Sequence, residues 1–393
     1  MVKSVLIVLK HLIYGGTEKY TLNLVNSLID KNISVTLISG DGPLASHVSS
    51  KVNLHIMPIS RKPRIREITE KRILEIAKAC NPQIIHTQCR TSMVNSQLAR
   101  TSLNLPLVTH EHHMYDSQDY PFIVDELRDG AEKIIAIGPY TKRKLVKNGI
   151  KKDGIISILN GVDVHNTFPI SVKERATARK LLKIHKNDKV IICLSRLEQG
   201  KGIDKLAMGF IEVARQIPEA KLFIVGDDET NFIKPFLKEL VEKNNLQNKL
   251  FILNGEYNIR KYHAVADVFC YPALGKGMAV MEAMAAALPV VGKRTFKKPF
   301  VVEHGISGFM TDETTFYKID PGRMAENLIN LLNNPKLSKK MGKAARERIE
   351  QKFNLDKTVE NVIESYNEAI ESYNLFSSKS MELSINNALL AYE

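Results

Sequence analysis

Short apolar runs alternate with longer stretches of helical periodicity along the first part of the chain. Turn residues bound the apolar runs, which is the pattern of buried strands separated by helices. The expected strands are residues 5–9, 35–39, 84–88, 106–111, 134–138 and 154–163, and the expected helices are 20–31, 67–78 and 94–102. Continuous apolar strands of this kind indicate a parallel sheet covered by helices on both faces. The pattern therefore predicts a doubly wound α/β domain.

The periodicity breaks after Asp163, and a second series of apolar runs follows a lysine-rich helix. Its expected strands are residues 190–195, 222–226, 250–253, 268–272, 289–292 and 308–311. This series predicts a second doubly wound, Rossmann-like domain. Two such domains facing each other across a cleft would place the carboxyl ends of their strands, where these folds bind ligands, on the cleft walls.

The predicted boundaries follow from these two series. We expect an N-terminal domain over residues 1–165, a linker near 164–186 and a C-terminal domain over 186–355. Residues 356–393 are predicted to form a helix that packs back on the N-terminal domain, followed by a tail without a strong pattern from about residue 376. Tyr366 and Tyr373 have the spacing of one buried helical face.

Composition and cysteine usage narrow the class of protein. The 393 residues are 44% hydrophobic and 25% charged, which is typical of a globular protein. The sequence contains no run of about 18 apolar residues, which a membrane span would need, and the first apolar run is too short for a signal peptide. The four cysteines form no CxxC pair, which argues against disulfide or metal roles. We predict a cytoplasmic protein without a bound cofactor.

A net charge of +13 predicts attraction to anions such as nucleoside diphosphates or phospholipid headgroups. Two basic clusters contribute to it: Arg61, Lys62, Arg64, Arg66, Lys71 and Arg72, and then Lys142, Arg143, Lys144, Lys147, Lys151 and Lys152. Both clusters are compatible with solvated helix faces. Aromatic residues are not interleaved with them, which argues against nucleic-acid binding. Docking of the first domain on an anionic membrane surface, at the inner face, is the functional alternative.

Several polar residues follow the expected strands closely. Gly15 and Gly16 open a helix after the first strand, and Arg196 and Lys201 follow the strand at 190–195. An arginine and a lysine at a strand's carboxyl end suit a diphosphate whose charge rises as its bond to a sugar breaks. Glu282 is expected at the start of an alanine-rich helix, where it could accept hydrogen bonds from ribose hydroxyls.

His110 closes the strand at 106–111 and begins the string His-Glu-His-His. Met114 stands four residues after His110, so the zinc-protease pattern HExxH is absent and no metal site is assigned. A strand-end histidine is a candidate hydrogen-bond donor to a substrate hydroxyl, or an acid–base group.

Taken together, these motifs resemble the GT-B enzymes of glycosyltransferase family 4 over most of the chain. In family order, the sequence shows GGTE at 15–18, His110, NGVD at 160–163, SRL with KG at 195–202, VGD at 225–227, ADVFCYP at 266–272, EAMAAALPVV at 282–291 and EHGISGF at 303–309. The resemblance implies transfer of a glycosyl group from a nucleotide-sugar, UDP- or GDP-linked, to an acceptor hydroxyl of a cell-envelope or surface glycan or lipid. It also implies retention of configuration and no bound metal.

The resemblance implies roles for individual residues. Arg196 and Lys201 would hold the diphosphate and stabilise the leaving group, and His110 would contact the sugar near the reacting carbon. The N-terminal domain would bind the acceptor and the C-terminal domain the nucleotide-sugar. The residues implied in nucleotide or donor binding are Gly16, Gly226, Glu256, Gly277, Met278 and Glu282.

The sequence departs from the family pattern in the expected sugar pocket. Leu274 stands where the family has a glutamate beside the donor sugar, and Phe296 to Phe300 replace a loop that usually carries two glycines and a carboxylate. Ala287 replaces a usual glycine. Three interpretations stay open: an active transferase with an unusual donor, a catalytically impaired binding or coat protein, and a related enzyme such as a sugar-nucleotide epimerase.

Overall fold

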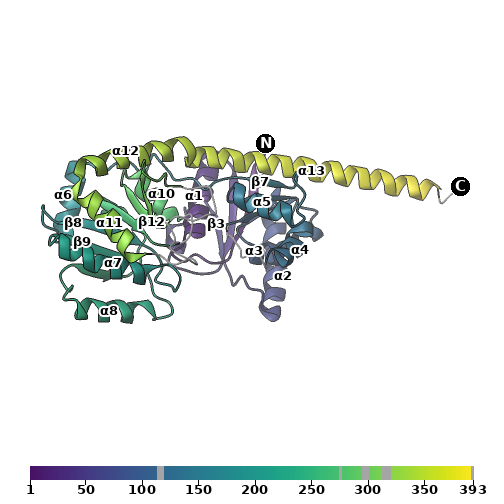
Figure 1. Ribbon diagram of the computed structural model, residues 1–393. Coiled ribbons are helices and arrows are strands. Elements are labelled where there is room, and N and C mark those ends of the chain that lie inside the picture. Colours follow the sequence, from purple (N-terminus) through teal and green to yellow (C-terminus); the bar gives the residue numbers. More distant parts are fainter. Residues whose placement is uncertain (113–118, 274–276, 294–300, 312–319, 391–393) are drawn as a thin grey trace. The chain divides into compact units, whose positions relative to one another are not determined.

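The computed structural model describes residues 1–112, 119–273, 277–293, 301–311 and 320–390, with side chains described as far as residue 375. Its chain forms two compact units, which Figure 1 shows as two sheets with their helices. The first unit combines Met1–Ile13, Thr17–Asn160 and Leu355–Glu393, and the second combines Tyr14–Gly16 and Gly161–Asn354. Each unit is an α/β structure with a parallel sheet, as the sequence predicts.

The first unit contains a seven-stranded parallel sheet in the order β3-β2-β1-β4-β5-β6-β7. Its strands are β1 Ser4–Leu9, β2 Ser34–Ser39, β3 Asn53–Ile56, β4 Ile84–Thr87, β5 Leu107–Glu111, β6 Lys133–Ala136 and β7 Ile155–Ser157. Strand β3 lies at the edge and is absent from the sequence prediction. Its sequence Asn-Leu-His-Ile is short and only half-buried, so it lacks the apolar run that marks the other strands.

Helices cover both faces of this sheet. The helices are α1 Gly16–Asp30, α2 Pro63–Cys80, α3 Arg90–Ser102, α4 Tyr120–Gly130, α5 Pro139–Lys147 and α13 Leu355–Leu390, with a short 3₁₀ turn at Ala45–His47. One face, which carries Leu6, Val8 and Ile85, forms an apolar core with residues of α2, α3, α4 and α5. Helices α1 and α13 supply side chains to the other face, where Tyr20 and Tyr366 are fully buried.

The second unit contains a six-stranded parallel sheet in the order β10-β9-β8-β11-β12-β13. Its strands are β8 Lys189–Leu194, β9 Ala220–Val225, β10 Leu250–Leu253, β11 Val268–Tyr271, β12 Val290–Lys293 and β13 Gly308–Thr311. Its helices are α6 Val172–Leu181, α7 Ile203–Gln216, α8 Ile233–Lys243, α9 Arg260–Val265, α10 Met278–Ala285, α11 Pro321–Asn333 and α12 Pro335–Lys352. Apolar residues of the central strands pack against α7, α8 and α11.

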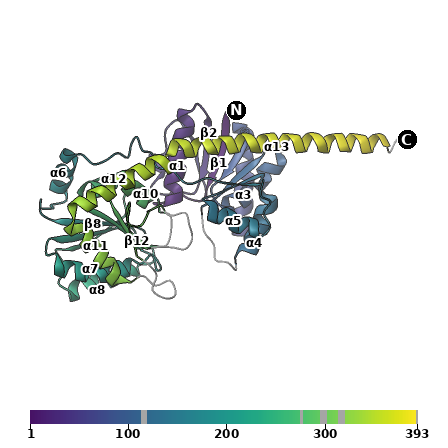
Figure 2. The same ribbon diagram turned by 45° about the horizontal axis from the view of Figure 1, so that its top comes forward.

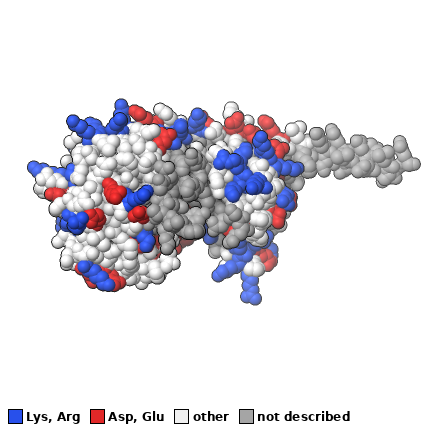
Figure 3. Space-filling model, in the orientation of Figure 1, with Lys and Arg blue, Asp and Glu red and all other residues white. Residues whose placement is uncertain are grey.

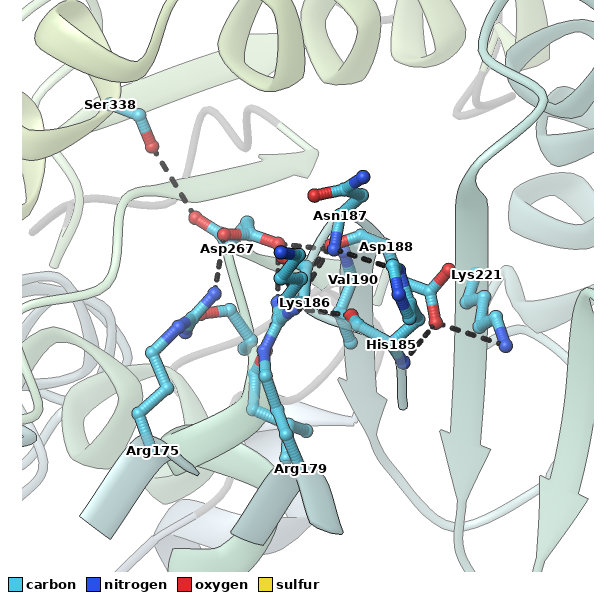
Figure 4. Close-up of polar contacts among 12 residues, drawn as sticks. Arg175, Arg179, His185, Lys186, Asn187, Asp188, Val190, Lys221, Asp267 and Ser338 are labelled. Carbon is cyan, nitrogen blue, oxygen red and sulfur yellow. Dashed lines mark hydrogen bonds and ion pairs between the residues drawn. The ribbon is translucent and has the colours of Figure 1, made fainter. Parts of the chain in front are cut away.

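A charged cluster fixes helix α6 at the amino-terminal edge of this sheet, as Figure 4 shows. The carboxylate of Asp267 accepts a hydrogen bond from Arg175 at 2.6 Å, from Arg179 at 3.2 Å and from the backbone N–H of Val190 at 2.8 Å. Arg179 is buried and also donates to the carbonyl oxygen of His185 at 3.0 Å. Because this cluster lies before strands β8 and β11, it stabilises the edge opposite to the expected site.

Helix α13 runs to Leu390, well past residue 376, beyond which the sequence pattern gave no assignment. Figures 1 and 2 both show its carboxyl-terminal part extending beyond the sheet of the first unit. Along its first part, Val359, Val362, Tyr366 and Ala369 are buried. Their spacing of three and four residues places them on one face of the helix, and this amphipathic face packs on the first unit.

The end of α10 has the backbone of a Schellman motif without its usual glycine. The N–H of Leu288 donates to the carbonyl of Ala283, and the N–H of Ala287 donates to Met284, each at 3.0 Å. Ala287, the residue after the helix cap, has a φ of 61°, in the left-handed region that glycine normally occupies. An alanine there carries a steric cost of about 1–2 kcal/mol.

We expect Ala287→Gly to raise the free energy of unfolding by about 1 kcal/mol, because it removes this steric cost while adding some backbone entropy to the unfolded chain. The melting temperature of a unit of this size should rise by about 2–4 °C in thermal denaturation. The control is Ala286→Gly, because Ala286 has a φ of −77° and gains nothing from glycine. A lower melting temperature for Ala287→Gly would contradict this account.

Candidate functional site

The predicted donor-site residues of the second unit follow the carboxyl ends of its strands. Arg196 follows β8, Gly226 follows β9, Glu256 follows β10, and Gly277 follows β11. Because the strands are parallel and hydrogen-bonded neighbours, their carboxyl ends lie along one edge of the sheet. In open α/β sheets this edge is where ligands bind.

Arg196 and Lys201 share one carboxylate. A guanidinium nitrogen of Arg196 lies 2.9 Å from Oε1 of Glu198, and the ammonium of Lys201 lies 3.7 Å from the other oxygen, Oε2. All three side chains are partly exposed. Two cations against one anion leave this cluster, Arg196–Glu198–Lys201, with a net positive charge at a strand end. Glu198 was not singled out from the sequence, although it stands between the two cations.

The backbone at Lys201 is set by two glycines. Gly200 has a φ of 83° and Gly202 a φ of 72°, so both occupy the left-handed region that residues with a side chain rarely adopt. Gly202 is the N-cap of α7, and the N–H of Lys201 donates to the carbonyl of Glu198 at 3.2 Å. The lysine is thus held in a tight turn at a helix amino terminus, where the helix dipole favours anions.

Gly226 allows the loop after β8 to pass very close to the end of β9. A Cβ atom at this position would lie 1.9 Å from the carbonyl oxygen of Ser195, so no other residue fits. The next residue, Asp227, accepts from the backbone N–H of Leu197 through its carbonyl and from the N–H of Gly255 through Oδ1. Gly226 and Asp227 therefore fix the three loops that follow β8, β9 and β10.

Glu256 lies in the loop that Asp227 anchors. Its carboxylate accepts a hydrogen bond from the hydroxyl of Tyr262 and pairs with the ammonium of Lys261 at 2.8 Å. Burial raises the pKa of Tyr262 well above its usual value, and the Glu256 carboxylate raises it further, so the phenol keeps its proton. The structure thus places Glu256 beside α9, in contact with partners from its own part of the chain.

Gly277 and Met278 begin helix α10. Gly277 is the N-cap, and a Cβ atom there would lie 2.8 Å from the Tyr271 hydroxyl, so glycine lets the helix start against this ring. Burial raises the pKa of Tyr271 to about 12, with the charge of Arg196 acting in the opposite direction. Because β8 and β11 are paired neighbours in the sheet, the residues that follow them lie at the same edge, where the charge of Arg196 acts on Tyr271.

Glu282 is buried and lies in the second turn of α10. The expectation that Glu282 begins the helix is wrong, because the helix starts at Met278, where the extended backbone of Gly277 gives way to helical geometry. Glu282 is therefore an interior residue of the helix, and every residue from Val280 to Ala285 is buried.

In the first unit, His110 lies at the carboxyl end of β5 and is fully buried. Both ring nitrogens are without a hydrogen-bond partner among the described residues. Burial lowers the pKa of His110 well below its usual value, and His112 and His86 lower it further, so the ring is neutral. A buried polar group with unused hydrogen-bonding atoms is a candidate for ligand recognition.

Gly16 is the first residue of α1, the helix that follows β1. The first turn of this helix is tied to the preceding loop, because Nδ1 of His11 lies 3.0 Å from the Glu18 carboxylate. Tyr14–Gly16 is grouped with the second unit, whereas the rest of α1 belongs to the first.

The departures from the family pattern at Leu274 and at 296–300 lie outside the described residues. Within the described ranges, no three histidine, cysteine, aspartate or glutamate residues are grouped so that they could hold a metal ion. In the same ranges, no helix is long and apolar enough to cross a membrane.

Two family models match consecutive parts of the chain. The model described as Glycosyltransferase Family 4 matches residues 14–166, and the model described as Glycosyl transferases group 1 matches residues 174–348. Each match falls on one of the two sheets, and together they span both.

Two of the curated relatives match along nearly their full length. An uncharacterized glycosyltransferase of Haemophilus influenzae is 27% identical over 364 residues, which is 88% of this chain and 94% of the relative. A UDP-Gal:alpha-D-GlcNAc-diphosphoundecaprenol alpha-1,3-galactosyltransferase of Escherichia coli is 22% identical over 377 residues, covering 90% of this chain and 93% of the relative.

Solved structures share the fold. The Anabaena protein HepE in complex with UDP-glucose superposes with a TM-score of 0.81 at 18% identity, covering 93% of this chain and 99% of HepE. The likeness confirms the predicted fold, in which two Rossmann-like units form a GT-B enzyme. From the family models, the relatives and the fold, the chain belongs to the glycosyltransferases of the GT-B fold and the family 4 type.

Proposed function

We propose that this glycosyltransferase moves a sugar from a nucleoside-diphosphate sugar to a hydroxyl of a cell-envelope glycan or lipid, with retention of configuration and without a bound metal. The observation that carries the proposal is the Arg196–Glu198–Lys201 cluster at the carboxyl edge of the second sheet. A diphosphate leaving group gains negative charge as its bond to the sugar breaks, and preorganised cations stabilise that charge.

The relatives make the donor and acceptor classes concrete. The Escherichia coli relative is named as a galactosyltransferase that uses UDP-Gal and a diphosphoundecaprenol-linked sugar, and HepE is in complex with UDP-glucose. We carry over the classes only, a nucleotide-sugar donor and a glycan or lipid acceptor. The base and the sugar of the donor stay open.

The remaining residues take roles that fit their surroundings. Glu282, a buried carboxylate on α10, accepts hydrogen bonds from the ribose hydroxyls. The N–H groups at the start of α10, after Gly277, favour the negative diphosphate. His110 contacts a sugar hydroxyl near the reacting carbon through one of its ring nitrogens, because a neutral imidazole offers one donor and one acceptor.

Lys201→Ala is expected to weaken nucleotide binding. Loss of one charge-assisted hydrogen bond to the diphosphate should raise the dissociation constant for the preferred nucleoside diphosphate roughly ten- to a hundredfold in calorimetry. Lys205→Ala is the matched control, because Lys205 lies in the first turn of α7, four residues after Lys201, and pairs with Asp204 at 3.3 Å outside the Arg196–Glu198–Lys201 cluster. An equal loss in both variants, or no binding of UDP, GDP or ADP by the wild type, would refute the proposed donor site.

The second candidate function is a binding or coat protein that has lost catalysis. It is favoured by Leu274, which cannot accept a hydrogen bond where the family has a glutamate, and by the bulky and basic residues at 296–300. Both departures concern the sugar pocket, whereas Arg196, Lys201 and Glu282 of the nucleotide site are present.

Leu274→Glu separates the two functions. For an active transferase, we expect wild-type turnover of at least one donor, within about a hundredfold of the Leu274→Glu rate, because one charge-assisted contact contributes about 1.5–3 kcal/mol. Leu274→Gln, which has the same shape without the charge, is the control in a donor-hydrolysis assay. Turnover that appears only in Leu274→Glu would establish the impaired protein instead.

The two basic clusters differ in how many of their cations form ion pairs. In the cluster on and just before α2, Arg66 pairs with Glu70, Lys71 with Glu67, and Arg72 with Glu75. In the cluster on and after α5, no ion pair joins any of the six cations to a carboxylate of the described chain. Figure 3 shows blue side chains gathered over the region of α5. We therefore propose the α5 cluster as the surface that meets anionic lipid.

Neutralising the α5 cluster is expected to weaken binding to vesicles that contain phosphatidylserine, by about 1 kcal/mol for each cation removed. The variant for co-sedimentation carries Arg143→Gln, Lys147→Gln and Lys151→Gln. The control carries Arg66→Gln, Lys71→Gln and Arg72→Gln, which removes three cations already paired with carboxylates. Binding that is insensitive to salt, or equally weakened in both variants, would rule out the α5 surface.

A further inference from the structure

One face of the first sheet carries a row of polar side chains where apolar packing would be expected. His86 of β4 and Gln88, two residues later, point to the same side of the sheet. Val108 of β5 is the partner of His86 in the sheet, so His110, two residues after Val108, also points to this side. All three polar side chains are fully buried. The opposite face of the same strands carries apolar residues, among them Ile85 and Leu107.

A continuous series of contacts runs from helix α13 to His110. The Tyr366 hydroxyl lies 2.6 Å from Nδ1 of His86, and the amide nitrogen of Gln88 lies 3.3 Å from the His86 ring nitrogens. The amide oxygen of Gln88 accepts from Nε2 of His112 at 3.0 Å. The rings of His112 and His110 are stacked, with centroids 3.9 Å apart and 18° between their planes.

The protonation states of the histidines determine which atoms of this series donate and which accept. Burial lowers the pKa of His86 to about 3 and that of His110 well below its usual value, so both rings are neutral near pH 7. The Gln88 carbonyl oxygen can only accept a hydrogen bond, so Nε2 of His112 carries a proton. The Gln88 amide nitrogen can only donate, so it needs an unprotonated ring nitrogen of His86. Each group therefore restricts the orientation of the next.

A purely structural role would be served better by apolar side chains. Buried polar groups are costly unless their hydrogen bonds are satisfied, and a satisfied network rigidifies the groups at its end. Tyr20 of α1 packs edge-on against His110 and His112, with ring centroids 5.1 Å apart in each pair. The His110 ring is thus held by stacking and edge contacts, while its own nitrogens form no hydrogen bond to the described chain.

We propose that Tyr366 is a positioning residue for His110, acting from the C-terminal helix through His86, Gln88 and His112. The proposal rests on the proposed role of His110 at the sugar, and it makes α13 part of the catalytic apparatus of the first unit. A histidine that must meet a sugar hydroxyl within hydrogen-bond distance needs a fixed ring, and a small displacement of such a group lowers the rate strongly.

The test compares Tyr366→Phe with Tyr373→Phe in the full-length protein. Both remove one hydroxyl from the same helix, but Tyr373 is only half-buried, and within the described residues no hydrogen bond or ring contact joins it to His86, His110 or His112. With a donor that the wild type turns over, Tyr366→Phe should lower kcat about tenfold to a hundredfold and leave the nucleotide dissociation constant unchanged. Tyr373→Phe should behave as the wild type in both measurements.

A second readout does not depend on activity. In protein labelled with ¹⁵N in its histidine rings, Tyr366→Phe should shift the ring resonances of His86 and also those of His110 and His112, while Tyr373→Phe leaves all three in place. Shifts confined to His86 would overturn the proposal. A wild type without turnover, but with shifts at all three histidines, would refute the proposed function and leave the positioning network standing.

A double variant tests the route. If Tyr366 acts through His86, then Tyr366→Phe added to His86→Phe should cause no further loss of kcat, because the contact is already broken. An additive loss would show that Tyr366 acts in another way. Should His86→Phe fail to fold, His86→Leu is smaller, has no hydrogen-bonding atom for the Tyr366 hydroxyl, and serves the same comparison.

Discussion

In the part of the chain that the structure describes, every strand of both sheets is parallel to its neighbours, and this constraint decides where the chemistry of the protein can lie. Parallel strands end at a common edge, so residues that follow different strands become neighbours there although they are far apart in sequence. In the second unit this edge collects Arg196, Gly226, Glu256 and Gly277. At the opposite edge, Asp267 and its arginines hold the strands' starting ends in place.

The Arg196–Glu198–Lys201 cluster at this edge is both ordered and positively charged. Glu198 holds Arg196 and Lys201 in place, and the helix amino terminus after Gly202 adds its dipole. Because one carboxylate faces two cations, the cluster is ordered yet retains a net charge that can meet a diphosphate. A fully neutralised cluster would be as ordered, but it would lack this attraction.

Much of this could be predicted from the sequence because strand and loop signals are local. The apolar runs marked six strands in each unit, and the order of the sequence placed Arg196 and Lys201 directly after the strand at 190–195. Strand β3 was missed, since its four residues are only half-buried. The partners of His110 were also missed, because Tyr366 meets His86 only through the path of α13 across the first unit. Contacts between distant segments leave no local pattern.

The left-handed backbone at Ala287 illustrates a second limit. The sequence showed an alanine in the place of a glycine, but only the hydrogen bonds of the Schellman motif show that the backbone kept the glycine conformation. The fold thus retains the geometry of α10, which carries Glu282, at the cost of local strain.

The central claim is that the cations of the second unit stabilise a departing nucleoside diphosphate. The most direct measurement is the release of nucleoside diphosphate from a panel of UDP-, GDP- and ADP-sugars, with and without glycan or lipid acceptors. The account predicts release from at least one donor by the wild type and none by the double variant Arg196→Ala, Lys201→Ala. Release at the wild-type rate by the double variant, or no release from any donor by the wild type, would contradict it.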